Sequence, residues 1–166
     1  MDLFEAIKKR RSVRQYLDKP VPKEVLEKLI DAARFAPTAR HTEPWTFVVV
    51  TEPNNIKAIG EATDSGRFIS KAAACIAVFC RDTKYYLEDG CAAIQNILLS
   101  ATSLGIGSCW VAGDKKPYCE KIIEMLGAPA DHKLIGLVSL GYPLSKDAFF
   151  EDKRKELKDL LHWNRF

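Results

Sequence analysis

The stretch from Gly90 to Gly113 is the longest part of this chain without a charged side chain. Its length would in principle allow it to cross a bilayer. Polar residues and helix-breaking glycines interrupt it, however, at Gln95, Asn96, Ser100, Thr102, Ser103, Gly105 and Gly107. Because such interruptions are typical of a soluble core rather than a membrane helix, we predict a buried helix followed by a strand, and no membrane partner.

The helix predicted in this stretch, residues 85–104, is apolar nearly all round. Its apolar residues are Cys91, Ala92, Ala93, Ile94, Ile97, Leu98, Leu99, Ala101 and Leu104. A surface helix of a small monomer normally keeps a polar face toward water. This helix is therefore either the central helix of the core or packs against a second subunit.

Helical and strand patterns alternate along the rest of the chain. The predicted helices span residues 2–10, 22–36, 85–104, 118–126 and 153–163, and the predicted strands span residues 45–51, 74–80, 107–113 and 134–142. The first helix is capped by Asp2, and the second ends before Pro37. The first two strands are rich in β-branched and aromatic residues, so we expect both to be buried on two faces. The pattern predicts an α/β or α+β fold with helices on both sheet faces.

Charge and cysteine content narrow the class of protein. The 25 basic and 22 acidic side chains are spread along 166 residues, which favours one domain over residues 1–166 and disfavours a nucleic-acid partner. The five cysteines include no CxxC pair, which predicts reduced thiols. The N-terminus lacks a signal-peptide pattern. Together these features favour a cytoplasmic protein.

The segment RRSVRQY, residues 10–16, begins where the first helix should end. Arginines at a helix C-terminus can simply complement the helix dipole, which contributes about 0.3 to 1 kcal/mol each. That explanation does not cover Ser12 and Arg14, which lie beyond the helix. A cation, a hydroxyl and a cation in an extended segment can converge on one anion. Phosphate is the anion that we predict.

Two further segments have the composition of ligand-binding loops. APTARHTEPW, residues 36–45, places polar residues between a helix and a strand, as functional loops on rigid scaffolds do. LGIGSCWVAG, residues 104–113, is not the GxGxxG fingerprint, because Trp110 occupies the place of the last glycine. Gly113, at the end of the predicted strand, can present a backbone N–H to a ligand. The three histidines show no metal-binding spacing, so we predict no metal site.

The chain closely resembles the FMN-dependent nitroreductase family in four segments that occur in the same order: RRSVRQY, PTARHTEPWTFVVV, DGCAAIQNILLSATSLGIGSCWVAG and RKELKDLLHW. The resemblance covers nearly the whole chain. It implies an α+β sandwich around a mainly antiparallel sheet, with helices on both faces. It also implies a domain-swapped homodimer, in which each chain end is exchanged onto the partner and the active sites lie at the subunit interface.

The resemblance implies tightly bound, non-covalent FMN, with the chemistry carried by the flavin and with NAD(P)H as the reductant. The cofactor-binding residues that it implies are Arg10, Arg11, Ser12, Arg14, Pro37, Thr38, His41, Ala112, Gly113 and Arg154. Lys153 and Lys155 are neighbours that could replace Arg154. The loop departs from the family's SxxNxQPW pattern, because His41 and Glu43 stand in place of the usual Asn and Gln.

The implied reaction is hydride transfer from NAD(P)H to the flavin, followed by reduction of a nitroaromatic, a quinone or a similar small acceptor in the same cleft. We assign Arg14 to stabilising the negative charge of reduced flavin, and the backbone N–H groups of Ala112 and Gly113 to the flavin ring. Relatives of this fold also dehalogenate tyrosines, oxidise heterocycles or break down flavin. A third alternative is a flavin-binding protein without turnover.

Overall fold

The computed structural model describes residues 1–145, 147–150 and 153–166. Its centre is a four-stranded antiparallel sheet in the order β1-β2-β4-β3. The strands are β1 (Trp45–Val50), β2 (Ala74–Arg81), β3 (Gly107–Ala112) and β4 (His132–Gly141). The two central strands, β2 and β4, are almost completely buried. The edge strands β1 and β3 border the surface.

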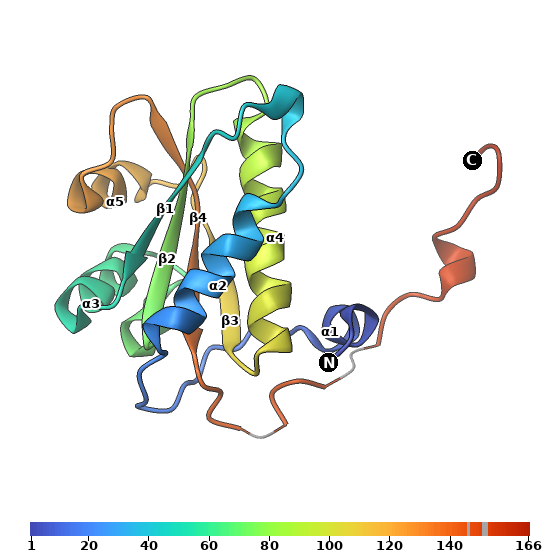
Figure 1. Cartoon of the computed structure of the whole chain (residues 1–166), viewed down its shortest axis with the longest axis horizontal. Coiled ribbons are helices and arrows are strands. Elements are labelled where there is room, and N and C mark those ends of the chain that lie inside the picture. The colour runs from blue at the N-terminus through green and yellow to red at the C-terminus, as the bar shows by residue number, and fades with distance from the viewer. Residues whose placement is uncertain (146, 151–152) are drawn as a thin grey trace.

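Helices cover both faces of the sheet (Figure 1). On one face, α2 (Lys23–Arg34) and α4 (Tyr86–Ser103) pack on side chains of β2 and β4 to form the larger core cluster. On the other face, α3 (Pro53–Ala62), the 3-10 helix η2 (Arg67–Lys71) and α5 (Cys119–Leu126) form the second cluster. The expectation of an α+β sandwich around an antiparallel sheet is confirmed.

The long apolar helix predicted in residues 85–104 is confirmed as α4. Its buried side faces the sheet and α2, which makes it the central helix of one core layer. At Gly90 an added Cβ would lie 2.6 Å from Ile135 Cγ1 and 3.0 Å from Cys80 Sγ, so glycine is needed for this close approach to the sheet. Within the described residues, no helix combines the length and apolarity that crossing a membrane requires.

Two expectations about local structure are wrong, and one helix was not expected. Strand β1 was expected to be buried on both faces, but it has a half-exposed pattern. It lies at the edge of the sheet, where β2 is its one strand neighbour among the described residues. Helix α3 was not predicted; Pro53 opens it in the first turn. The helix predicted over residues 153–163 is only the 3-10 turn η3 (Leu157–Asp159). A short segment without tertiary packing has little to stabilise a helix.

The first helix, α1 (Leu3–Lys9), begins as predicted, with Asp2 Oδ1 accepting a hydrogen bond of 2.9 Å from the Glu5 amide. Its apolar face is not buried in this chain. Leu3, Phe4 and Ile7 are all exposed, and Ala6 is its buried residue. At the other terminus, residues 153–166 run away from the body of the protein (Figure 1). We call residues 153–166 the C-terminal arm.

Candidate functional site

The arginines predicted to bind phosphate line one pocket of about 530 Å³. It is formed by two segments from opposite ends of the sequence, and its lining residues are Arg10, Arg11, Ser12, Val13, Arg14, Gln15, Ser145, Ala148, Phe150 and Arg154. We call it the arginine pocket. The structure therefore places Arg154 of the arm in the same pocket as the N-terminal segment.

The N-terminal segment is fixed to the sheet by backbone and side-chain contacts. Ser12 forms a parallel bridge with Ser108 of β3, and the Val13 amide donates to the Ser108 carbonyl at 2.9 Å. The Tyr16 hydroxyl lies 2.5 Å from the Val13 carbonyl oxygen and 2.7 Å from Ser139 Oγ. Burial raises the pKa of the Tyr16 phenol, so this group stays neutral. These contacts fix the backbone between Arg11, which is half-buried, and Arg14, which is exposed.

The arginine pocket is rich in cations. Arg11 donates to the Arg10 carbonyl at 2.6 Å, and its guanidinium lies 4.9 Å from the centre of the Phe150 ring. Arg14 donates to the Ser12 carbonyl at 3.2 Å and lies over the Phe68 ring at 5.6 Å. Among the described residues, no carboxylate pairs with the three N-terminal arginines. Such a cluster is suited to binding an anion.

The outer edge of β3 offers a second polar feature. Gly113 donates its N–H to the Ile135 carbonyl at 3.1 Å, so the expectation that this amide is available to a ligand is wrong. An added Cβ at Gly113 would lie 2.7 Å from the Leu134 carbonyl oxygen, and glycine therefore serves close backbone packing. Amide directions alternate along an antiparallel strand, so the N–H of Ala112 points to the open edge. The Ala112 carbonyl accepts from the Tyr118 hydroxyl.

The loop of residues 37–43 is held against the start of α4. Buried Asp89 accepts hydrogen bonds from Thr38 Oγ1 at 2.9 Å and from the Ala39 amide at 3.0 Å. His41 is exposed and has a positive φ of 56°. The loop therefore presents a histidine on a strained but anchored backbone.

The predicted site residues fall into two groups within one chain. The arginine pocket lies beside Ser108, at the start of β3, whereas Asp89 holds the loop at the start of α4. The start of β3 lies near the end of α4, at the other end of this helix (Figure 1). At 1.5 Å per residue, the helix between these points is about 20 Å long. Pro37, Thr38 and His41 thus do not line the arginine pocket of their own chain.

Several residues of the site were not predicted. Phe68 and Phe150 lie under the guanidinium groups of Arg14 and Arg11, and Asp89 holds the loop. The two aromatic contacts depend on tertiary packing that no local pattern reveals. Asp89 has a weak signal, because it is one of two acidic residues in the first turn of a helix that carries no other charge, where the helix dipole favours a negative charge.

Comparisons with known proteins identify the fold and the family. A model described as "Nitroreductase family" matches residues 7–75 and 80–142. A protein of Archaeoglobus fulgidus, provisionally named as an NADH dehydrogenase/NAD(P)H nitroreductase, is 35% identical over 97% of this chain and 97% of its own length. The chain belongs to the nitroreductase family. Membership identifies it as an oxidoreductase of the nitroreductase type, as the sequence resemblance predicted.

Solved structures of other nitroreductase family members support the same assignment. An FMN-dependent nitroreductase of Clostridium difficile superposes with a TM-score of 0.90 at 29% identity, covering 98% of this chain and 99% of that one. A family member of Desulfovibrio desulfuricans, solved in complex with FMN, has a TM-score of 0.86 at 25% identity and covers 100% and 98% of the two chains. FMN as a cofactor is thereby confirmed for the family.

Proposed function

We propose that residues 1–166 form one FMN-dependent oxidoreductase domain that works as a homodimer and reduces small oxidised acceptors with NAD(P)H. The observation that carries this proposal is the arginine pocket. It joins the N-terminal segment to Arg154 of the arm and has no carboxylate among its described lining residues. A dianionic phosphate group complements such a site by charge and by its acceptor oxygens.

The residues of this chain fit FMN at more than the phosphate. The pocket opens beside Ser108 of β3, and Ala112, four residues further along the same edge, carries the outward N–H. Residues in a strand rise about 3.3 Å each, so a molecule that reaches from the arginines to Ala112 extends about 13 Å along the edge. FMN is an elongated ligand with phosphate at one end and a hydrogen-bonding ring at the other.

Each group has a role in the proposed reaction. Bound FMN would supply the hydride chemistry, accepting electrons from NAD(P)H and passing them to the acceptor. Arg10, Arg11, Ser12 and Arg154 hold the phosphate. Arg14, at the inner end of the segment, provides positive charge that stabilises the reduced cofactor. The Ala112 N–H donates to the ring, which fixes the orientation of the ring against β3.

A homodimer follows from where the site residues lie. The loop with Pro37, Thr38 and His41 is about 20 Å away from the arginine pocket along α4, so a single chain supplies only part of the predicted flavin contacts. A second copy can supply the remaining contacts if it packs with its loop over the first copy's β3 edge. We propose that the predicted residues meet at this subunit interface.

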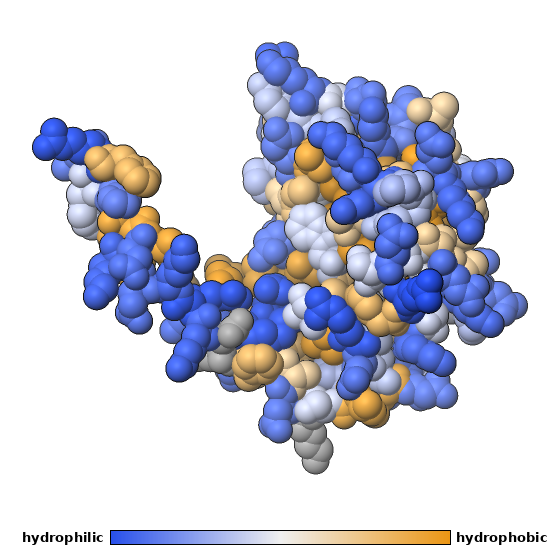
Figure 2. All heavy atoms as spheres, turned by 180° about the vertical axis from the view of Figure 1, so that it is seen from behind, coloured by the Kyte–Doolittle hydropathy of each residue, from blue (hydrophilic) through white to orange (hydrophobic). Residues whose placement is uncertain are grey.

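The C-terminal arm indicates how the two copies associate. Its apolar residues are exposed in the single chain, at 71% for Leu157, 60% for Leu160 and 79% for Trp163, and Figure 2 shows apolar side chains along the arm, away from the body of the protein. Exposing this many large apolar side chains to water is unfavourable. The arm therefore requires a surface to cover it.

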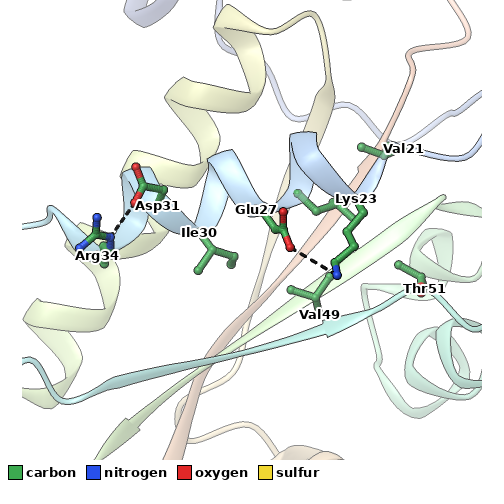
Figure 3. A pocket seen from close by; sticks show the side chains of 9 residues that line it. Val21, Lys23, Glu27, Ile30, Asp31, Arg34, Val49 and Thr51 are labelled. Carbon is green, nitrogen blue, oxygen red and sulfur yellow. Dashed lines mark hydrogen bonds and ion pairs between the residues drawn. The ribbon is translucent and has the colours of Figure 1, made fainter.

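A groove of about 710 Å³ between α2 and β1 is a suitable surface (Figure 3). Leu26, Ile30 and Val49 line its apolar part. Ion pairs lie along its α2 side, at 3.5 Å between Lys23 and Glu27 and at 2.6 Å between Arg34 and Asp31. Beside it runs the free edge of β1, whose backbone groups can pair with an added strand. We propose that the arm of each subunit crosses to this groove of its partner.

A different reaction on the same flavin is the second candidate. Iodotyrosine deiodinase 1 of Rattus norvegicus is 30% identical over 96% of this chain and 68% of its own length. That alignment spans 197 positions, more than the 166 residues here, so the deiodinase carries insertions that this chain lacks. In this chain η2 leads almost directly into β2, which leaves no room there for an added lid. We therefore favour small, unselective acceptors.

The proposal is tested with purified protein and FMN. We expect a yellow complex that bleaches when NAD(P)H is added without air and regains colour when a quinone or a nitroaromatic is added. Arg14→Gln should lower the midpoint potential of the bound flavin, by about 30 mV for each tenfold loss of preference for the reduced form. A protein that stays colourless and does not bind added FMN would contradict the proposed function.

A further inference from the structure

Asp89 is a buried carboxylate whose two oxygens both bind the same loop. It lies in the first turn of α4 and is 4% exposed. Oδ2 accepts from Thr38 Oγ1 at 2.9 Å, and Oδ1 accepts from the Ala39 amide at 3.0 Å. No cation among the described residues pairs with it. Its charge is thus supported by these two donors and by the helix N-terminus.

The hydrogen bond from Thr38 has a directional consequence. Because the Thr38 hydroxyl gives its proton to Asp89, its oxygen lone pairs are turned toward the loop. The Glu43 amide donates to this oxygen at 3.2 Å. The connection from Asp89 through Thr38 to Glu43 therefore closes the loop around His41, whose own side chain has no hydrogen bond to any described residue.

The closed loop holds an unfavourable backbone. Arg40 and His41 have φ values of 56°, and Glu43 has a φ of 42°. Residues with a Cβ rarely adopt this left-handed region, and three of them within four positions persist only where surrounding contacts enforce the geometry. Asp89 provides such contacts from the rigid helix, and the Arg81 guanidinium adds a bond of 3.0 Å to the Thr42 carbonyl.

We propose that Asp89 is a positioning residue of the flavin site, which holds residues 38–43 of one subunit so that His41 meets the ring of the flavin bound by the other. This inference rests on the proposed function, since it assumes that the loop contacts flavin across the interface. Asp89 itself does not touch the cofactor. Because Asp89 acts through the loop, its loss should change the contacts of the flavin ring and leave the contacts of the phosphate unchanged.

Asp89→Asn tests the proposal in the full-length protein. The amide keeps the size of the side chain and one acceptor, but it replaces the acceptor for the Thr38 hydroxyl with a donor. We expect FMN to bind about tenfold or more weakly, as for loss of a hydrogen bond to a charged group. The visible absorption of bound flavin should also shift, while the ratio of FMN to riboflavin affinity should stay unchanged. Glu88→Gln, a change at the exposed neighbour, is the control. It should leave the FMN affinity, the flavin absorption and the ratio of FMN to riboflavin affinity unchanged.

A second pair of variants covers the case in which Asp89→Asn does not fold. Thr38→Val removes the hydroxyl and should reproduce the spectral shift, whereas Thr38→Ser keeps the hydroxyl and should restore the wild-type spectrum. If wild-type protein does not bind FMN, the proposed function fails and this inference fails with it. If wild-type protein binds FMN but these variants lower only the midpoint of urea unfolding and leave the flavin spectrum unchanged, the positioning role alone is wrong.

Discussion

The two termini of the chain differ in how their residues are held, although both contribute to the arginine pocket. Residues 10–16 are fixed by the Ser12–Ser108 bridge and by buried Tyr16, which bonds to Val13 and to Ser139 of β4. Residues 153–166 are exposed throughout. Their backbone hydrogen bonds outside helices and strands are local, such as that between Arg165 and Trp163 at 2.8 Å.

This difference shows which half of the arginine pocket a single chain can form and which half needs a second copy of the chain. The N-terminal half of the pocket is formed by the fold itself, since β3 and β4 position it. The C-terminal half carries large apolar side chains in water, which a folded protein does not leave without cover. The pocket should therefore become a functional site only when the arm is held by a partner subunit.

The largest effect is expected from removing the arm. A chain without residues 153–166 loses Arg154 and the apolar side chains that we place on the partner. We expect it to keep its far-ultraviolet circular dichroism, to sediment as a monomer and to bind no FMN at micromolar concentrations. Analytical ultracentrifugation with flavin absorbance measures both properties. A truncated chain that still sediments as a dimer with bound flavin would show that the arm is dispensable.

Trp163→Ala is a smaller perturbation of the same arm. Buried tryptophans at interfaces commonly contribute 2 kcal/mol or more, so the dissociation constant of the dimer should rise about 30-fold or more. Dilution experiments monitored by fluorescence anisotropy would measure it. Asn164→Gly, one residue further along, is compatible with the positive φ of 64° at this position. It is the matched control and should have little effect. Equal effects of the two variants would argue against burial of Trp163.

Arg154→Gln separates charge from packing within the arm. If Arg154 contacts phosphate, FMN affinity should fall about 10-fold to 100-fold, while riboflavin affinity should not change. Isothermal titration with both ligands gives the two values. Arg165→Gln keeps the same loss of charge outside the pocket and serves as the control. Should Arg154→Gln leave the affinity for FMN intact, Lys153 and Lys155 become the candidates for the phosphate contact.

Tyr16→Phe examines the better-held terminus and should have the smallest effect. Loss of its hydrogen bonds should lower the free energy of unfolding by about 1 kcal/mol near neutral pH. Burial raises the pKa of Tyr16, so the folded chain keeps a proton that the unfolded chain releases near pH 10. Wild-type stability should therefore fall as the pH rises above 10, more steeply than that of the variant. Urea titrations at pH 8 and 10.5 measure the difference.

Features that depend on local pattern were predictable from the sequence. The period of α2 and α4, the β-branched runs of β1 and β2, and the cap at Asp2 all appear where expected. Features that depend on neighbours were not. The sequence WTFVVV is apolar enough for a central strand, but strand order makes β1 an edge. The pattern at residues 153–163 suits a helix, but these residues are exposed throughout and form only the short turn η3.

In the candidate site, too, features that depend on local pattern were predictable and features that depend on neighbouring elements were not. The basic segment and Arg154 were predicted, and they line one pocket; their contact with FMN stays a prediction. Gly113 was expected to donate its amide to a ligand, yet that amide pairs with Ile135. The family pattern points to residues 112 and 113, but only the pairing between β3 and β4 decides which of the two amides faces outward.

The pairing of β3 with β4 therefore contributes to stability and also decides which backbone N–H groups of β3 face its open edge. Residue 112 faces outward because 113 is engaged inward, and the alternation repeats every two positions. Sliding the strand by a single residue would reverse this order along its whole length. It would turn the glycine amide toward the open edge of β3 and that of Ala112 toward β4. An insertion in the tight turn after α4 should thus abolish cofactor recognition even in a protein that still folds.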